Sequence, residues 1–117
     1  MINILNLPPI RFLDDYSALG VDFWGLTAQN EPTDGNVPGF TFNCMGWNST
    51  SQREWIVNNL GPTLEAEGYG DVKLMILDDQ RPLAPKWARE VIAMHVIKLE
   101  NCFLSPIFIR CLKIQEL

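Results

Sequence analysis

Two apolar runs, each ending in a cluster of polar and acidic residues, constrain the fold of this chain more than any other feature. The first run is residues 21–28, which the triplet Gln29-Asn30-Glu31 follows and Pro32 stops. The second is residues 71–77, which the cluster DDQR follows at residues 78–81. Short apolar and aromatic runs bounded by turn signals predict buried strands. Both predicted strands therefore carry carboxylates at their carboxyl ends.

Helical patterns flank and separate these strands. Residues 11–19 carry apolar side chains at helical spacing, and Gly20 supplies a stop. A capping-box pattern at residues 51–54, SQRE, predicts that the next helix begins at Ser51, and Gly61-Pro62 predicts a kink in it. A further helix is predicted over residues 85–92.

The resulting order of elements is helix, strand, helix, strand, helix. This alternation is typical of βα units around a parallel sheet or barrel. A complete eight-stranded barrel needs about 250 residues. We therefore predict an α/β chain that holds about two βα units. Trp24, Trp55 and Trp87 fall on its strands and helices, and we interpret them as core anchors.

The charge and the ends of the chain argue against several classes of function. The formal net charge is −5 over 117 residues, whereas a nucleic-acid-binding surface needs clustered Lys and Arg. Cys44, Cys102 and Cys111 lack the number and spacing of a zinc site, and we expect neither a metal nor a cofactor. The start lacks the pattern of a secretory signal, and the apolar run at residues 103–109 is shorter than the roughly 20 residues of a membrane span. We expect no nucleic acid partner and no transmembrane segment.

Glu31 is the leading candidate for a chemical residue. In parallel α/β folds, ligands and catalytic groups gather at the carboxyl ends of the strands. The loop at residues 33–47 carries Phe40 and Phe42, and aromatic side chains beside a strand-end carboxylate suggest a lined pocket. A carboxyl group in a partly dry pocket has a raised pKa and can donate a proton. The alternative is that Glu31 is a solvated loop acid.

The neighbouring acids Asp78 and Asp79 also have two interpretations. They could belong to a metal site, but adjacent strand residues point in opposite directions and no third ligand is near. We therefore expect them to make structural hydrogen bonds at the rim of the sheet.

Three segments of the chain together resemble the glucosylceramidases of glycoside hydrolase family 30: DFWGLTAQNEP at residues 22–32, GPTL at residues 61–64 and LMILDDQR at residues 74–81. The resemblance runs from about Phe12 to Ile92. It implies that residues 11–92 are a partial TIM barrel, (β/α)8, catalytic domain that contains the fourth and fifth strands. It also implies a lysosomal β-glucosidase that cleaves a glycosphingolipid, glucosylceramide, to glucose and ceramide with retention of configuration.

The resemblance implies roles for five residues. Glu31 resembles the acid/base residue of the family, and Asn30 the neighbour that hydrogen-bonds the 2-hydroxyl of the sugar. Gln80 resembles a residue at the pocket entrance, and Phe40 and Phe42 match aromatic positions beside the aglycone. Because strict alternation would send Asn30 and Glu31 to opposite faces, we expect a bulge or an irregular peptide between them.

The departures from the family predict an incomplete site. Residues 1–10 and 93–117 do not match the family, and no segment matches the one that carries its nucleophile. A retaining glycosidase needs a second carboxylate about 5 Å from the first. We therefore expect a truncated chain that has negligible turnover alone and lacks the signal that would take it to the lysosome. The alternative is a non-catalytic interaction module that self-associates through the exposed edges of both strands.

Overall fold

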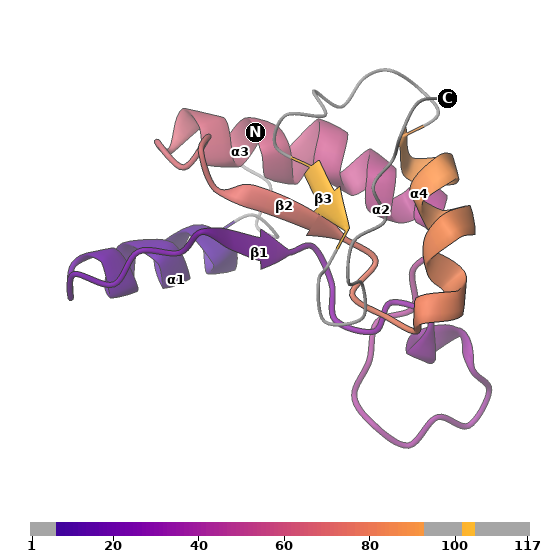
Figure 1. Ribbon diagram of the computed structural model, residues 1–117. Helices are drawn as coiled ribbons and strands as arrows, with labels where there is room; N and C mark the ends of the chain where they lie inside the picture. The colour runs from indigo at the N-terminus through magenta and orange to yellow at the C-terminus, as the bar shows by residue number, and fades with distance from the viewer. Residues whose placement is uncertain (1–6, 93–101, 105–117) are drawn as a thin grey trace.

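The computed structural model describes residues 7–92 and 102–104, and in these ranges it shows a parallel sheet with helices between its strands (Figure 1). The strands are β1 (Gly25–Thr27), β2 (Lys73–Ile76) and β3 (Cys102–Leu104), and they lie in that order in the sheet. Leu26 lies opposite Leu74, and Met75 lies opposite Phe103. Parallel neighbours need crossover connections, which the helices provide. The predicted α/β architecture of βα units is confirmed.

The strands differ from the prediction in extent and number. Only the three residues of β1 pair with β2, out of the predicted residues 21–28. Trp24 lies just before the paired residues, and its side chain is 64% exposed. Its interpretation as a core anchor is therefore wrong, because no described element covers this position. β3 lies where no strand was predicted, so β2 is the central strand of the described sheet and not an exposed edge.

The first helix, α1 (Leu7–Ser17), begins earlier than predicted. Pro8 and Pro9 lie in its first turn, where the missing amide hydrogens would be unpaired in any case. Its end agrees with the predicted stop at Gly20. Gly20 has φ 77°, and the amides of Gly20 and Val21 bond back to the carbonyls of Ser17 and Tyr16. This is a Schellman cap, which needs the left-handed conformation that glycine adopts without strain.

The second helical run has three parts: α2 (Ser49–Trp55), the π-helical turn η3 (Ile56–Leu60) and α3 (Gly61–Ala66). Its cap is Asn48 and not Ser51. Asn48 Oδ1 accepts from Ser51 N at 2.9 Å, and Ser51 Oγ accepts from Asn48 N at 2.9 Å. Asn is as good an N-cap as Ser, so the earlier start makes the same reciprocal box. The interruption that Gly61-Pro62 predicts is present, because the π turn ends at Leu60 and α3 begins at Gly61. Pro62 lies in the first turn of α3, where its missing amide hydrogen costs little.

The core lies between these helices and one face of the sheet. Along β2, burial alternates, and Leu74 and Ile76 are buried. A short 3-10 turn, η4 (Arg81–Leu83), leads into α4 (Ala84–Ile92), whose Trp87 and Val91 are 7% and 1% exposed. The other buried apolar residues of the core come from α1, the second helical run, the residue after β2 and the first residue of α4: Ile10, Leu13, Ile56, Leu60, Leu64, Leu77 and Ala84. Trp87 is thus the core anchor that the sequence predicted.

None of the helices in the described ranges is long and apolar enough to cross a membrane.

Candidate active site

The turns that follow β1 and β2 are joined by hydrogen bonds at the carboxyl end of the sheet. Glu31 N donates to the carbonyl oxygen of Asp78 at 2.9 Å. Thr33 donates to Asp79 Oδ2 twice, from its backbone N at 2.9 Å and from its hydroxyl at 2.6 Å. Asp79 is 4% exposed, and its Oδ1 accepts from Gln80 N at 2.6 Å. The structural role expected for Asp79 is therefore confirmed.

The backbone of these turns is irregular. Glu31, Leu77 and Asp78 have φ values of 41°, 72° and 56°. Residues other than glycine rarely adopt this left-handed region, and such conformations cluster at functional sites where the surrounding structure holds them. The irregular peptide expected at Asn30-Glu31 is present. Because β1 ends at Thr27, Asn30 and Glu31 lie beyond the alternation of the strand, and the left-handed backbone of Glu31 orients it independently of the strand.

Gln52 on α2 hydrogen-bonds the backbone of the irregular turn after β2. Its Oε1 accepts from Leu77 N at 3.0 Å and from Trp87 Nε1 at 2.8 Å, and the side chain is fully buried. The bond to Leu77 N holds a left-handed residue next to Asp78, whose carbonyl receives Glu31 N. No motif in the sequence predicted this role for Gln52. Its signal was the spacing, because Gln52 stands four residues before Ile56 on the apolar stripe of the helix.

The pKa of Glu31 is raised, as expected, but the largest cause is the charge of a neighbouring acid and not a dry pocket. The side chain is partly exposed. The pKa of Glu31 is raised above its ordinary value of 4.5, first by the charge of Asp34 and next by desolvation. A side-chain hydrogen bond with Asp34 and the charges of Asp79 and Asp78 add to the rise. Neighbouring acids therefore favour the protonated form of Glu31 more than an apolar surrounding does.

Two other predicted site residues, Asn30 and Gln80, lie near this turn and are more exposed than Glu31. Asn30 is exposed, and its carbonyl accepts from Gln29 Nε2 at 3.3 Å. The side chain of Gln80 is exposed, while its backbone joins the Asp79 network.

Phe40 and Phe42 lie on the long loop between η2 (Asp34–Asn36) and α2, and their side chains are 42% and 76% exposed. Figure 1 shows this loop projecting from the remainder of the chain as an open ring. The loop is closed at its base, where Trp47 N donates to the carbonyl oxygen of Pro32 at 2.8 Å.

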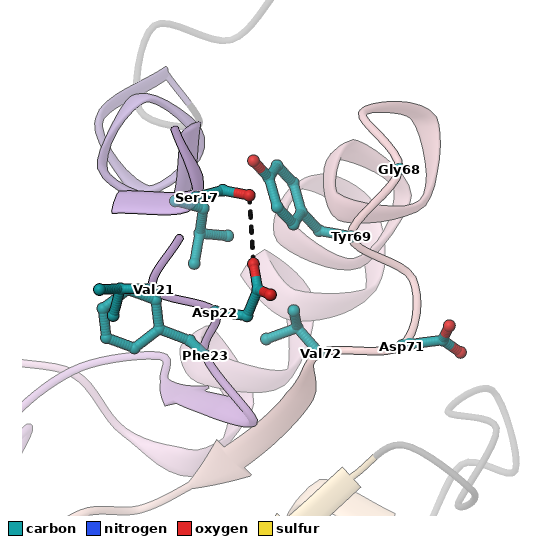
Figure 2. Close-up of a pocket in the computed structure, with 9 residues that line it drawn as sticks. Ser17, Val21, Asp22, Phe23, Gly68, Tyr69, Asp71 and Val72 are labelled. Carbon is teal, nitrogen blue, oxygen red and sulfur yellow. Dashed lines mark hydrogen bonds between the residues drawn. The ribbon is translucent and has the colours of Figure 1, made fainter. Parts of the chain in front are cut away.

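A cavity of about 300 Å³ lies at the opposite end of the sheet (Figure 2). It is lined by residues that precede β1 and β2, among them Asp22, Phe23 and Tyr69. Ser17 Oγ donates to Asp22 Oδ1 at 3.1 Å across its wall. This cavity is separate from Glu31, because the residues that line it precede the strands whereas Glu31 follows one.

No group of three or more His, Cys, Asp or Glu residues within the described ranges is arranged to hold a metal ion. Both oxygens of Asp79 already accept from N–H and O–H donors. The rim residues Glu31, Asn30 and Gln80 carry carboxyl and amide side chains, which can donate and accept hydrogen bonds.

Parallel strands joined by helices, with acids on irregular turns at the strand carboxyl ends, define a portion of a (β/α) barrel of the kind that carries many enzymes. The profile of the glycosyl hydrolase family 30 TIM-barrel domain matches residues 8–98. The chain belongs to this family, and the predicted resemblance and the predicted partial TIM barrel are both confirmed.

The curated proteins that this chain resembles include proteins named as glucosylceramidases. The lysosomal acid glucosylceramidase of Mus musculus is 48% identical over 84 residues, which are 72% of this chain and 16% of the relative. The putative glucosylceramidase 1 of Caenorhabditis elegans is 44% identical over 84 residues, again 16% of its length. The chain thus spans about one-sixth of the length of these curated relatives.

Two solved structures have the same fold over most of this chain. SrfJ from Salmonella typhimurium has a TM-score of 0.65 and 24% identity, covering 75% of this chain and 19% of that protein. The endo-β1,6-glucanase BT3312 has a TM-score of 0.65 and 17% identity, covering 80% and 21%. At these identities the likeness bears on the fold alone.

Proposed function

We propose that this chain carries the proton-donating half of a retaining β-glucosidase site that acts on glucosylceramide. The observation that carries the proposal is the position of Glu31 on an irregular turn at the carboxyl end of β1, in a surrounding that raises its pKa. A general acid must hold its proton at the working pH in order to protonate the leaving oxygen. The 48% identity to a glucosylceramidase supports the choice of substrate.

The sugar contacts in this proposal come from the neighbours of Glu31. Asn30 hydrogen-bonds the 2-hydroxyl of the glucose ring, and Gln80 lies at the pocket entrance. Phe40 and Phe42 form the wall beside the ceramide chains, where two exposed aromatic rings on one loop suit an apolar aglycone. The exposure of all four side chains supports a site that is open in this chain.

We propose that this chain lacks the second carboxylate of the mechanism, which acts as the nucleophile. The two carboxyl groups of a retaining glycosidase stand about 5 Å apart so that the sugar fits between them. Asp34 lies in the same short turn as Glu31, which the bond from Asp34 N to the carbonyl oxygen of Glu31 closes at 3.1 Å, and it does not belong to another strand end that could face Glu31 across a sugar. Asp79 is buried, and both of its oxygens are occupied. We therefore expect negligible turnover from this chain alone.

An aryl β-glucoside assay of the purified chain tests the missing carboxylate. The expected result is no turnover above the buffer blank. Turnover that Glu31→Gln abolishes would contradict the half-site and would mean that a second carboxylate is available. Asp78→Asn would then identify whether that carboxylate is Asp78.

A chimera tests the role of Glu31. Residues 11–92 replace the matching segment of the mouse relative, and glucosylceramide turnover is measured. We expect Glu31→Gln in the chimera to lower turnover by about 10²–10⁴-fold, and by less for an aryl glucoside whose leaving group needs no proton. The control is Glu54→Gln, an exposed acid on α2. Equal losses for both substrates would count against an acid role.

The raised pKa of Glu31 also bears on the cellular compartment in which we propose that the site works. A raised pKa at Glu31 suits an acidic lumen, because the acid form persists there. We propose a lysosomal setting on this ground and on the description of the mouse relative.

A second candidate function is an interaction module without glycosidase activity. The observation that favours it is the large apolar exposure near β1: Leu19 and Trp24 are 80% and 64% exposed. β1 is also an edge strand within the described sheet. Exposed strand edges with apolar neighbours promote pairing with other chains.

A further inference from the structure

We propose that the cavity at the amino end of the sheet binds a small organic cation, an ammonium group carried on a short apolar or aromatic body. The cavity lies at the end of the strands opposite Glu31, so a ligand there would not compete with a substrate at the rim. This second site does not depend on the proposed role of Glu31.

The cavity lies where three segments meet: the end of α1, the residues before β1 and the turn between α3 and β2 (Figure 2). Backbone hydrogen bonds close two of these segments. Val21 N donates to the carbonyl oxygen of Tyr16 at 3.0 Å, and Tyr69 N donates to that of Leu64 at 2.7 Å. The volume of about 300 Å³ is at the lower limit of the roughly 300–1,000 Å³ of small-molecule sites, which suits one ring with a short chain.

One carboxylate oxygen at the cavity has no partner. Asp22 Oδ1 accepts from Ser17 Oγ at 3.1 Å, whereas Asp22 Oδ2 accepts no hydrogen bond and forms no ion pair within the described ranges. Figure 2 shows the carboxylate of Asp22 directed toward Ser17 and Tyr69, while that of Asp71 points away from them. Ser17 therefore orients Asp22 and leaves its second oxygen free to accept from a ligand.

The charge at the cavity is negative. The described residues that line it include Asp22 and Asp71 but no Lys, Arg or His. The hydroxyl of Tyr69 already donates its proton to Asp14 Oδ1, at 2.5 Å, so it has none to offer an anion. An ammonium group, in contrast, would make a charge-assisted hydrogen bond to Asp22 Oδ2.

The remaining walls suit an apolar body. Leu13 is 3% exposed, and Val72 is half-buried and stands beside Asp22 in Figure 2. The ring of Tyr69 lines the same space, and an aromatic face attracts a cation. A metal ion fits less well, because no group of three or more His, Cys, Asp or Glu residues in the described part of the chain is arranged to hold one.

The test is an NMR titration of the full chain with phenethylammonium, followed through the backbone amide shifts at constant pH and ionic strength. Two ligands of similar shape are compared with it: phenethyl alcohol, which is uncharged, and phenylacetate, which is an anion. Calcium chloride tests a metal alone. The variants are Asp22→Asn, which keeps an acceptor for Ser17 and removes the charge, and Asp15→Asn, an exposed acid on α1 that does not line the cavity.

We expect phenethylammonium to shift the amides of residues 13–23 and 68–72 saturably, with an affinity about tenfold higher than that of the alcohol, because the amine gains a hydrogen bond to a charged group. Phenylacetate and calcium should leave these amides in place. Asp22→Asn should lower the affinity for the amine to that for the alcohol, and Asp15→Asn should leave it unchanged.

Four results would overturn the proposal. The first is equal affinity for the amine and the alcohol, since apolar contact alone would explain it; this comparison needs no variant and stands even if Asp22→Asn does not fold. The second is an equal loss in Asp15→Asn, which would be an effect of net charge. The third is a calcium-induced shift of the same amides, which would indicate a metal site. The last is the absence of any saturable shift with the amine.

Discussion

At the scale of single residues, a buried glutamine organises the rim. Gln52 Oε1 joins three elements, because it lies on α2 and accepts from the end of β2 and from Trp87 on α4. Its partner Leu77 has a left-handed backbone at φ 72°, which costs free energy that the hydrogen bond offsets. Hydrogen bonds thus connect Gln52 to Leu77, and connect Asp78, the next residue, to Glu31.

We predict that Gln52→Leu destabilises the chain by about 2–6 kcal/mol, because two buried donors lose their acceptor at roughly 1–3 kcal/mol each. Urea denaturation of both proteins measures the difference. Gln80→Leu is the control, since that side chain is exposed, and its change should stay within about 0.5 kcal/mol. Equal losses in the two variants would show that Gln52 has no special role.

At the scale of elements, each helix is attached by polar bonds as well as by its apolar stripe. Ser49 Oγ donates to Glu90 Oε2 at 2.5 Å, and Arg53 Nη1 donates to the Glu90 carbonyl at 3.0 Å, which ties α2 to α4. α1 is attached by Tyr69, which follows α3 and donates its hydroxyl to Asp14 Oδ1 at 2.5 Å. The hydrogen bond to Asp14 raises the pKa of Tyr69 from 10.0 to about 12.

The Tyr69–Asp14 bond predicts a pH-dependent attachment of α1. Because the pKa of Tyr69 is higher in the folded chain than in the unfolded one, its stabilisation is complete below pH 10 and is lost as the pH rises toward about 12. We expect Tyr69→Phe to lower the melting temperature at pH 8, and the difference from the native chain to shrink between pH 10 and 12. Calorimetric scans across this range measure it.

Tyr16→Phe is the control for this series. Tyr16 lies on α1 and packs its ring edge-on against Phe23 at 5.3 Å. Its difference from the native chain is measured at each pH and compared with that of Tyr69→Phe. A Tyr69→Phe difference that is constant with pH would mean that the bond to Asp14 does not hold α1.

At the scale of the whole molecule, the described sheet is open at β1. Barrels remove strand edges by closure, and this chain spans about one-sixth of the length of its barrel relatives. Gly25 of β1 lies so close to β2 that a Cβ there would stand 2.8 Å from the carbonyl oxygen of Lys73. One edge of β1 is thus tightly paired, and the other is where self-association would occur.

We predict that the chain self-associates at micromolar concentrations through β1 and its apolar neighbours. Trp24→Lys places a charge at this edge and should shift the sedimentation profile toward monomer. Phe42→Lys is the control, because Phe42 is similarly exposed but lies on the projecting loop. A native chain that remains monomeric at all concentrations would remove the interaction-module candidate.

The sequence predicted most of the elements and the strand-end position of Glu31. Helical spacing and glycine stops are local signals, so α1, the interruption at Gly61-Pro62 and the cap at Gly20 could be predicted from short windows. The sequence-based prediction was wrong in two situations. In one, two nearby residues could both cap the same helix; in the other, the burial of a side chain depended on elements distant in the sequence. Asn48 replaced Ser51 as the cap, and Trp24 is exposed because no described element covers it.

By itself, the sequence determined the βα order and the family, because these depend on periodicity and on contiguous motifs, and it predicted Glu31 as the residue most suited to chemistry. Only the tertiary structure decided what surrounds Glu31. Thr33 and Asp79 are 46 residues apart, and Gln52 and Leu77 are 25 apart. Such partners meet only when parallel strands bring their carboxyl ends together. For this reason the sequence predicted a raised pKa from a dry pocket, whereas the fold raises it first through the charge of Asp34.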